Sequence, residues 1–371
     1  MEALMKELNS RGIKAEQMFS ITEESYRSAK NFMQRFVLRL SQYVLYPIYL
    51  FLHLFLEEVK RVLYKGTDTG LIVVSTNTFY APLIATFFNK KVVHLVYDLF
   101  PEAMIHSGKW KEGQIRVKFF RWLVGITLKR ASCNVFLGDR IKEYVSTIHG
   151  KTYNNVTIPV GADERPFKNS LFREEKEEIE ILYCGNFGNM HDHETFFDAL
   201  SEGLDADLLF SFHCSGPKRK ILQSFLRLKA QKKHFRLFLG EGLNYNEWIK
   251  KMEEAEIALV TMSDGSEQVV MPSKTYSAMM AGQAILAIAP ENSDLVDLIK
   301  KTDCGWWVTP GESQKLKQLL TTIKEDKVLL KRKRKNAFAA AHKYFSQSCL
   351  AEDWISLFHK LEDKNRNNIN H

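Results

Sequence analysis

The stretch DGSEQVVMPSKTYSAMMAGQAILAIA, residues 264–289, decides how the second half of this 371-residue chain folds. A β-branched run precedes it, and its own end, Ala284–Ala289, has the apolar character of a buried parallel strand. Between these runs, Pro272 and Ser273 favour the start of a helix, and Gly282 favours its end. The stretch therefore predicts a strand–helix–strand unit of a parallel sheet.

Lys274 is the unusual residue of this unit. It falls in the first turn of the helix, where its charge opposes the helix dipole by roughly a few tenths of a kcal/mol. Free N–H groups together with a cation favour a bound anion such as a phosphate. From the residues alone, a phosphate site and an ordinary unit with a surface lysine both remain open.

The composition is that of a soluble globular protein, with 45% hydrophobic and 26% charged residues, and the length suits two domains. The net charge of +8 indicates an anionic partner: nucleic acid, an acidic membrane surface or a phosphorylated substrate. The five cysteines are scattered without a CxxC pair, which is typical of free thiols in a reducing compartment. The first eight residues lack the apolar core of a signal peptide.

A long helical tract is predicted over residues 26–64, and residues 30–64 form its apolar part. Its centre, YVLYPIYLFLHLFL (Tyr43–Leu56), is interrupted by Pro47 and His53. A spanning helix needs about 20 apolar residues, so this run is short. Flanking basic residues and many aromatic residues are typical of an interfacial helix. A core helix, an interfacial helix and a spanning helix all remain open.

From Gly70 onward, short β-branched runs alternate with helical segments, which is the pattern of βαβ units on parallel sheets. The runs are GLIVVST, KVVHLVYDLF, SCNVFLG and NVTIP, followed by IEILYCG, DLLFSFHCSG, FRLFLG, IALVTM, QAILAIA and WWV. A charged connection near residue 165 separates the two groups. The pattern predicts an α/β protein with two Rossmann-like domains, residues 1–164 and 165–345, and a C-terminal helix with a polar tail at 346–371. We expect the first domain to lack its first strand.

Two carboxylates follow the predicted strand that ends at Tyr97. Asp98 comes directly after it and Glu102 shortly behind. Ligands bind beyond the carboxyl ends of parallel strands, so these groups are candidates for orienting or deprotonating a hydroxyl group. The alternative is that Asp98 caps the next helix and Glu102 complements its dipole.

Two loops of the second domain have the residues of an anion site. In CGNFGNMHDHE (184–194), Gly185 and Gly188 let the backbone approach a ligand where a helix begins. In CSGPKRK (214–220), cations stand at a helix start, where they are unfavourable unless they contact an anion.

Four segments in chain order resemble the bacterial glycosyltransferases of the GT-B fold, in the large retaining family 4. They are YDLFPEAMIHSG, LYCGNFGNMHDHETFFDAL, VVMPSKTYSAMMAGQAILAI and CGWWVTPGE, within roughly Gly70 to Gly311. The nearest likeness is to the branch that makes capsular, O-antigen and other exopolysaccharides. The resemblance implies two Rossmann-like domains facing across a cleft, at the inner face of the cytoplasmic membrane.

The same resemblance implies a hexosyl or N-acetylhexosaminyl transferase. Its donor is a UDP- or GDP-linked sugar held by the second domain, and its acceptor is a lipid-linked or other saccharide received by the first. It implies a retaining mechanism without a bound metal or other cofactor, an anionic membrane surface as a partner, and no nucleic acid.

The residues that match the family's motifs are then assigned as follows. Asp98 and Glu102 face the sugar and the acceptor hydroxyl. Protein groups neutralise the diphosphate in place of a metal. The donor-binding candidates are Gly185, Asn186, Gly188, Lys218, Arg219, Gly240, Pro272, Ser273, Lys274 and Ser277.

The chain departs from the family's pattern in the donor site. Ser277 stands where many members have a glutamate that contacts the ribose, and Val269 stands eight residues earlier, where they have another. The ribose contact is expected to move to Glu267 or Asp294. The usual Arg/Lys pair after the first strand of the second domain is also missing, and His191 lies in that loop. These departures keep two rivals open: a sugar-nucleotide 2-epimerase, and a degenerate non-catalytic subunit of a polysaccharide assembly complex.

Three further patterns are weak. His191 and His193 form an HxH pair without an evident third metal ligand. Asp205-Ala206-Asp207 matches the DxD of metal-dependent glycosyltransferases, but it precedes a strand, on the side away from ligands. The run KRKRK (331–335) resembles a nucleic-acid patch, but within a lysine-rich helix we expect a solvated or membrane-near face.

Overall fold

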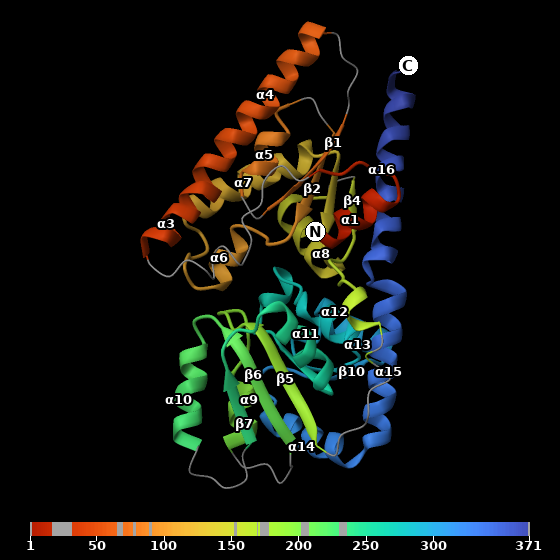
Figure 1. Ribbon diagram of the computed structural model, residues 1–371. Helices are drawn as coiled ribbons and strands as arrows, with labels where there is room; N and C mark the ends of the chain where they lie inside the picture. Colours follow the sequence, from red (N-terminus) through yellow and green to blue (C-terminus); the bar gives the residue numbers. More distant parts are fainter. Residues whose placement is uncertain are drawn as a thin grey trace. The chain divides into compact units, whose positions relative to one another are not determined.

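The chain folds into two compact units, which are residues 1–158 with 351–371, and residues 159–350. A computed structural model describes residues 2–16, 32–64, 70–76, 79–88, 91–151, 154–168, 170, 178–201, 208–229 and 236–369. Each unit combines a parallel sheet with covering helices (Figure 1).

The sheet of the first unit has four parallel strands in chain order. They are β1 (Leu71–Ser75), β2 (Lys91–Val96), β3 (Cys133–Phe136) and β4 (Asn155–Thr157). The inner strands β2 and β3 are almost wholly buried, as expected for parallel strands with helices on both faces.

Helices surround this sheet (Figure 1). They are α1 (Glu2–Ser10), α3 (Phe32–Leu40), α4 (Tyr46–Tyr64), α5 (Ala81–Ala85), α6 (Glu102–His106), α7 (Ile115–Arg130) and α8 (Asp139–His149). The short α5 contacts both α4 and α7. Leu50 and Leu54 of α4 pack with Ala81, Ala85 and Phe88 in one apolar core cluster.

The predicted apolar tract is helical throughout its described part, from Phe32 to Tyr64. A π-helical turn, Ser41–Leu45, joins α3 to α4 just before Pro47. Proline cannot donate a backbone hydrogen bond, and a π-turn is one way for a helix to absorb such a gap. No helix within the described ranges is both long enough and apolar enough to cross a membrane.

The second unit contains a six-stranded parallel sheet in the order β10-β9-β8-β5-β6-β7. The strands are β5 (Ile179–Asn186), β6 (Leu208–Ser215), β7 (Arg236–Gly240), β8 (Ile257–Thr261), β9 (Ala284–Ile288) and β10 (Gly305–Val308). The chain winds outward from β5 in one direction and then from β8 in the other. This doubly wound order places a topological switch point between β5 and β8.

The first five helices of this unit lie between its strands in the chain, and the last two follow β10. They are α9 (Glu194–Ser201), α10 (Arg219–Lys229), α11 (Tyr245–Glu254), α12 (Lys274–Met280), α13 (Asp294–Thr302), α14 (Ser313–Glu325) and α15 (Lys327–Tyr344). The predicted helix at Lys274 is confirmed as α12, and Gly282 ends it with a φ of 71°. Ser273 occupies the N-cap position, although its side chain makes no capping hydrogen bond.

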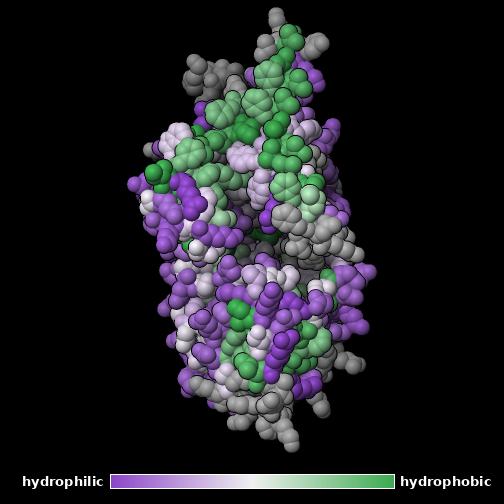
Figure 2. All heavy atoms as spheres, turned by 90° about the vertical axis from the view of Figure 1, so that its left-hand side faces the viewer, coloured by the Kyte–Doolittle hydropathy of each residue, from purple (hydrophilic) through white to green (hydrophobic). Residues whose placement is uncertain are grey.

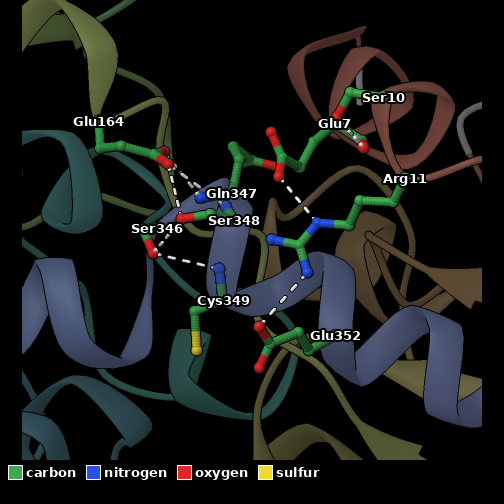
Figure 3. A network of polar contacts seen from close by, with 9 residues as sticks. All are labelled: Glu7, Ser10, Arg11, Glu164, Ser346, Gln347, Ser348, Cys349 and Glu352. Atoms are coloured by element: carbon green, nitrogen blue, oxygen red, sulfur yellow. Dashed lines mark hydrogen bonds and ion pairs between the residues drawn. The ribbon is translucent and has the colours of Figure 1, made fainter.

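The last helix, α16 (Gln347–Ile369), starts in the second unit and continues in the first. Its backbone is helical through most of the segment expected to be a polar tail. At its start, Cys349 N donates to Ser346 Oγ (3.2 Å), and Glu164 accepts from Gln347 N (3.0 Å) and Ser348 Oγ (2.8 Å) (Figure 3). These bonds satisfy the free N–H groups of the first turn.

Within the first unit, Arg11, which directly follows α1, connects that helix to α16. Arg11 donates to Glu352 of α16 at 3.3 Å and to Glu7 of α1 at 2.9 Å (Figure 3). Leu4 and Leu8 of α1 are buried, so the first helix of the chain is packed into this unit. The unit is thus assembled from both ends of the chain.

The basic run Lys331–Lys335 is solvated only in part, because Lys331, Arg332 and Lys335 are exposed and the other two cations are not. Lys333 is buried and pairs with Asp303, and Arg334 Nε donates to the Gly282 carbonyl at 2.9 Å. Two of its cations therefore hold α15 against the rest of the second unit.

The α/β architecture itself is confirmed. Each of the ten β-branched runs forms a strand, and both sheets are entirely parallel. The predicted break near residue 165 lies close to the start of the second unit at Pro159.

Candidate functional site

The carboxyl ends of β5, β6 and β8 form the candidate ligand site of the second unit. These strands are neighbours in the sheet, with β5 between the other two. The switch point between β5 and β8 is where doubly wound sheets bind ligands. The predicted loops after β5 and β6 and the start of α12 all lie at this edge.

Backbone hydrogen bonds join the loops after β5 and β6. Phe187 N donates to Ser215 O at 2.7 Å, and Lys218 N donates to Phe187 O at 3.1 Å. Gly216 makes this approach possible: its φ is 102°, and a Cβ there would lie 2.2 Å from Asn186 Oδ1. Glycine alone suits that position, and it brings Asn186 next to the basic turn.

Lys274 reaches this edge from α12. Its Nζ lies 3.9 Å from the centre of the Tyr183 ring on β5. The nitrogen is enclosed and has no hydrogen-bond partner among the described residues. Burial lowers the pKa of Lys274 from 10.5 to about 7. A cation–π contact offsets only part of the cost of desolvating an ammonium group, so the site is suited to an anion.

Other polar atoms near Lys274 are also left unpaired. Within the described chain, four buried side-chain atoms between residues 261 and 275 lack a hydrogen-bond partner: Thr261 Oγ1, Glu267 Oε2, Lys274 Nζ and Thr275 Oγ1. Buried polar groups of folded proteins are normally paired, and unpaired ones call for an explanation. A polar ligand that enters between β8 and α12 would supply the missing partners.

Lys218 and Arg219 are engaged differently. Lys218 Nζ donates to the carbonyl of His191. Arg219 donates to Cys214 O at 2.8 Å and Gly240 O at 2.5 Å, and it pairs with Glu241 at 2.6 Å. These two cations hold the loops after β5, β6 and β7 together, whereas Lys274 contacts no polar partner in the described part of the chain.

His191, in the loop after β5, lies against the end of β8. His191 Nδ1 lies 2.8 Å from Thr261 O. Burial and then the charge of Lys274 lower the pKa of His191 to about 3, so the ring is neutral. The described residues contain no group of three or more side chains able to hold a metal ion. The Asp205-Ala206-Asp207 pattern lies outside the described residues.

The remaining donor-site candidates occupy the same sheet edge or the next strand along. Gly185 has a φ of 123° and open space around its α-carbon, while Gly188 packs near Asn186. Gly240 ends β7, one strand beyond β6. On α12, Pro272 is buried at the entry, Ser273 is exposed and Ser277 is half-buried.

In the first unit, Asp98 and Glu102 have different surroundings. Asp98 follows β2, reaches solvent, and has its N–H held by Thr76 Oγ1 at 3.2 Å. Partial desolvation by the surrounding protein raises the pKa of Asp98 above its usual value. Glu102 is only 1% exposed, and Arg121 donates to its Oε1 at 2.7 Å. Asp98 is therefore the carboxylate that an external hydroxyl group can reach, while Glu102 is buried, with Oε1 paired to Arg121 and Oε2 without a partner among the described residues.

Sequence reasoning missed Tyr183 and Arg121. Tyr183 is 0% exposed and lies two residues before Gly185. From the sequence it looks like any buried tyrosine of a strand. Arg121 is one of five cations on α7, and no local pattern separates it from the others. Alternation along β5 places Tyr183 on a defined face, but only the fold brings Lys274 over it.

Comparison with known proteins agrees with this architecture. No protein-family model matches the chain. The chain is 26% identical over 274 residues to the probable glycosyltransferase WbjE of Pseudomonas aeruginosa. The match covers 71% of this chain and 66% of that protein, which is just under two thirds of the relative's length.

Solved structures share the fold at lower identity. Sucrose-phosphate synthase from Thermosynechococcus elongatus superposes with a TM-score of 0.65 at 16% identity, covering 85% of this chain and 79% of that one. Anabaena Alr3699/HepE, in complex with UDP, gives a TM-score of 0.64 at 14% identity, covering 81% and 82%. These likenesses confirm the GT-B fold expected from the four motifs.

Proposed function

We propose that this chain, which has the fold of the GT-B glycosyltransferases, is itself a glycosyltransferase with a nucleoside-diphosphate sugar as its donor. Its curated relative is described as a probable glycosyltransferase. A structural neighbour, Anabaena Alr3699/HepE, was solved with UDP-glucose. The proposal rests mainly on one observation of this chain, the enclosed and unpaired ammonium group of Lys274.

A donor diphosphate provides the anion that Lys274 lacks. The same groups that bind it also promote the reaction, because negative charge grows on the diphosphate as the bond to the sugar breaks. The backbone of the Gly185–Gly188 loop and the charge of Lys218 are proposed to add to this stabilisation. Asn186 is positioned beside them for a neutral hydrogen bond, and Gly240 is proposed to meet the base.

We propose a retaining transfer of a hexosyl or N-acetylhexosaminyl group without a metal ion. Protein cations take the place that a metal has in DxD enzymes, which is why the charge of Lys274 matters. UDP and GDP are the nucleotides to test first, and the acceptor is proposed to be a lipid-linked saccharide of a surface polysaccharide.

Asp98 is proposed to contact the acceptor hydroxyl group. It reaches solvent at the carboxyl end of β2, and a raised pKa makes a carboxylate a better proton acceptor. Glu102 is proposed to act on the site through Arg121, since both groups are already ion-paired.

Calorimetry on the full chain tests the donor site. UDP, GDP and their sugar conjugates are titrated with and without a chelator. We expect binding that survives the chelator and that falls at least about tenfold in Lys274→Met, which loses the charge but keeps the apolar stem. Lys220→Met is the matched control, because Lys220 is an exposed cation of the neighbouring basic turn. The donor-site proposal fails if no nucleotide binds, or if Lys274→Met binds like the wild type.

Turnover separates the enzyme from its rivals. With donor and a lipid-linked acceptor fraction, a transferase releases nucleoside diphosphate only when the acceptor is present. Epimerised donor without acceptor would identify a sugar-nucleotide epimerase, and binding without either product would identify a non-catalytic subunit.

A further inference from the structure

The helix α7 has two apolar faces instead of one. Val117, Val124 and Leu128 are buried on one side. On the other side Ile115, Phe119 and Trp122, spaced four and then three residues apart, are 85%, 51% and 60% exposed. A surface helix of a globular protein normally carries a single apolar stripe toward its core. The second stripe therefore faces solvent without a structural reason.

Cations border this second stripe on both sides. At 100° per residue, Lys118 and Lys129 lie along one edge, and Arg116 and Arg130 along the other. The helix has no acidic residue. An exposed apolar stripe between rows of long cationic side chains is typical of a helix in a membrane interface, where the cations extend to the headgroups.

The helix α4 carries more exposed apolar side chains of the same unit. Leu50 and Leu54 point into the core, while six large side chains are each about half exposed: Ile48, Tyr49, Phe51, Leu52, Phe55 and Leu56. Monomeric soluble proteins rarely expose so many neighbouring apolar groups.

The two helices are connected through the end of α5. Phe51 of α4 packs edge-on against Phe88, with ring centres 5.5 Å apart. Arg130 of α7 lies 5.0 Å over the ring of the exposed Phe87. Figure 2 shows hydrophobic side chains gathered over the first unit on the side of α3, α4 and α7. We call the exposed apolar side chains of α4 and α7, with Phe87 between them, the apolar face.

We propose that the apolar face binds the interface of an anionic lipid bilayer, with α4 and α7 lying in the plane of the membrane. No described helix qualifies as a span. A second copy of the chain fits less well, because two-fold pairing through α7 brings its cations toward one another. Anionic headgroups neutralise these cations instead. This inference does not rest on the proposed activity, and it gives the expected inner-membrane location a defined surface.

Flotation of the full chain with vesicles tests the inference. Vesicles contain phosphatidylcholine alone or phosphatidylcholine with phosphatidylglycerol, at low and at high salt. We expect the wild type to float with the anionic vesicles, most at low salt. Leu52→Glu/Leu56→Glu is expected to reduce the bound fraction at least about tenfold, because it places charges in the apolar layer. Lys118→Gln/Lys129→Gln is expected to weaken both binding and its salt dependence.

The matched control is Leu228→Glu/Val328→Glu, which makes the same change at exposed apolar positions of α10 and α15 in the second unit. Circular dichroism checks that each variant is folded. Brominated lipids provide a second readout, since they should quench Trp122 in the wild type and quench less in Trp122→Phe, which keeps an aromatic group. Wild type that fails to float, apolar-face variants that float as the wild type does, or a dimer that these variants dissociate would each overturn the inference. Nucleotide binding is unaffected by any of these outcomes, so the two proposals fail separately.

Discussion

A buried lysine without an anion lowers the stability of the free protein, and Lys274 is the clearest case here. Because its pKa falls from 10.5 to about 7 on folding, the unfolded chain binds more protons between these pH values. Stability therefore rises as the pH increases from 7 to 10.5, opposite to the behaviour of a paired lysine. The penalty at neutral pH is on the order of a few kcal/mol.

We therefore expect Lys274→Met to raise the melting temperature of the ligand-free protein at pH 7 while it weakens donor binding. The increase in melting temperature should become smaller toward alkaline pH, because the wild-type lysine is then neutral in both the folded and the unfolded state. Thermal unfolding at several pH values measures this, with Lys220→Met as the unchanged control. A variant less stable than the wild type would mean that Lys274 has a structural partner, and would remove the main support for an anion site.

Glu267 is one of the two carboxylates proposed to replace the ribose-binding glutamate whose position Ser277 occupies. It is 7% exposed, and its Oε2 has no partner among the described residues. A buried carboxylate with an unpaired oxygen can accept hydrogen bonds from ribose or sugar hydroxyl groups.

We expect Glu267→Gln to weaken binding of a nucleoside diphosphate about tenfold, because a charged acceptor is lost, and to leave pyrophosphate binding unchanged. Competition calorimetry with both ligands provides the comparison. The exposed neighbour Asp264→Asn serves as control. Equal loss for both ligands would show that Glu267 acts on the phosphates or on folding, and not on the hydroxyl groups.

At the level of elements, the turn after β6 depends on Gly216. A Cβ there would lie 2.2 Å from Asn186 Oδ1 and 2.8 Å from the Phe187 carbonyl, in a backbone conformation that side chains disfavour.

We expect Gly216→Ala to cost about 2 kcal/mol or more and to loosen the joined loops after β5 and β6. Denaturant unfolding measures the loss of stability, and hydrogen exchange of the loop amides measures the loosening. Gly242→Ala is the control, because no atom lies within 4 Å of its would-be Cβ. Equal effects of the two substitutions would contradict the close approach of the loops.

The elements themselves were readable from the sequence. Buried parallel strands such as β8 and β9 are continuous apolar runs, and Gly282 marks the end of α12. Contacts between distant elements were not readable. Tertiary packing brings Lys274 over the ring of Tyr183 and pairs Glu102 with Arg121. Local sequence propensity contains no information about such contacts. Ser273 likewise has the residue type of a helix cap without making the bond.

At the level of the whole molecule, the two units differ in how the chain builds them. The second unit is one continuous segment, residues 159–350, whereas the first needs residues 351–371 in addition to 1–158. A continuous unit with its own sheet and core is expected to fold by itself. The first unit without its part of α16 loses the partners of α1, including the bond from Arg11 to Glu352.

Residues 159–164 and 346–350 complete the second unit at its ends. Glu164 accepts bonds from Gln347 and Ser348, and Ala162 N donates to Phe345 O at 2.9 Å. Gly161 is tightly packed, because a Cβ there would lie 2.3 Å from Leu350 Cδ1. The boundaries predicted from sequence, 165–345, would cut away this layer while keeping all six strands.

We therefore expect a fragment of residues 159–350 to be folded and to bind the same nucleotide as the full chain. A fragment of residues 165–345 should melt at a lower temperature, because it leaves the groups around Ser346 and Glu164 without their partners. Thermal unfolding and nucleotide calorimetry on both fragments make the comparison. Glu164→Gln in the longer fragment isolates the contribution of one side chain. Its melting temperature should lie between those of the two unsubstituted fragments. Equal stability of the fragments would mean that the unit ends at residues 165 and 345, and loss of nucleotide binding in a folded 159–350 fragment would mean that the donor site requires the first unit.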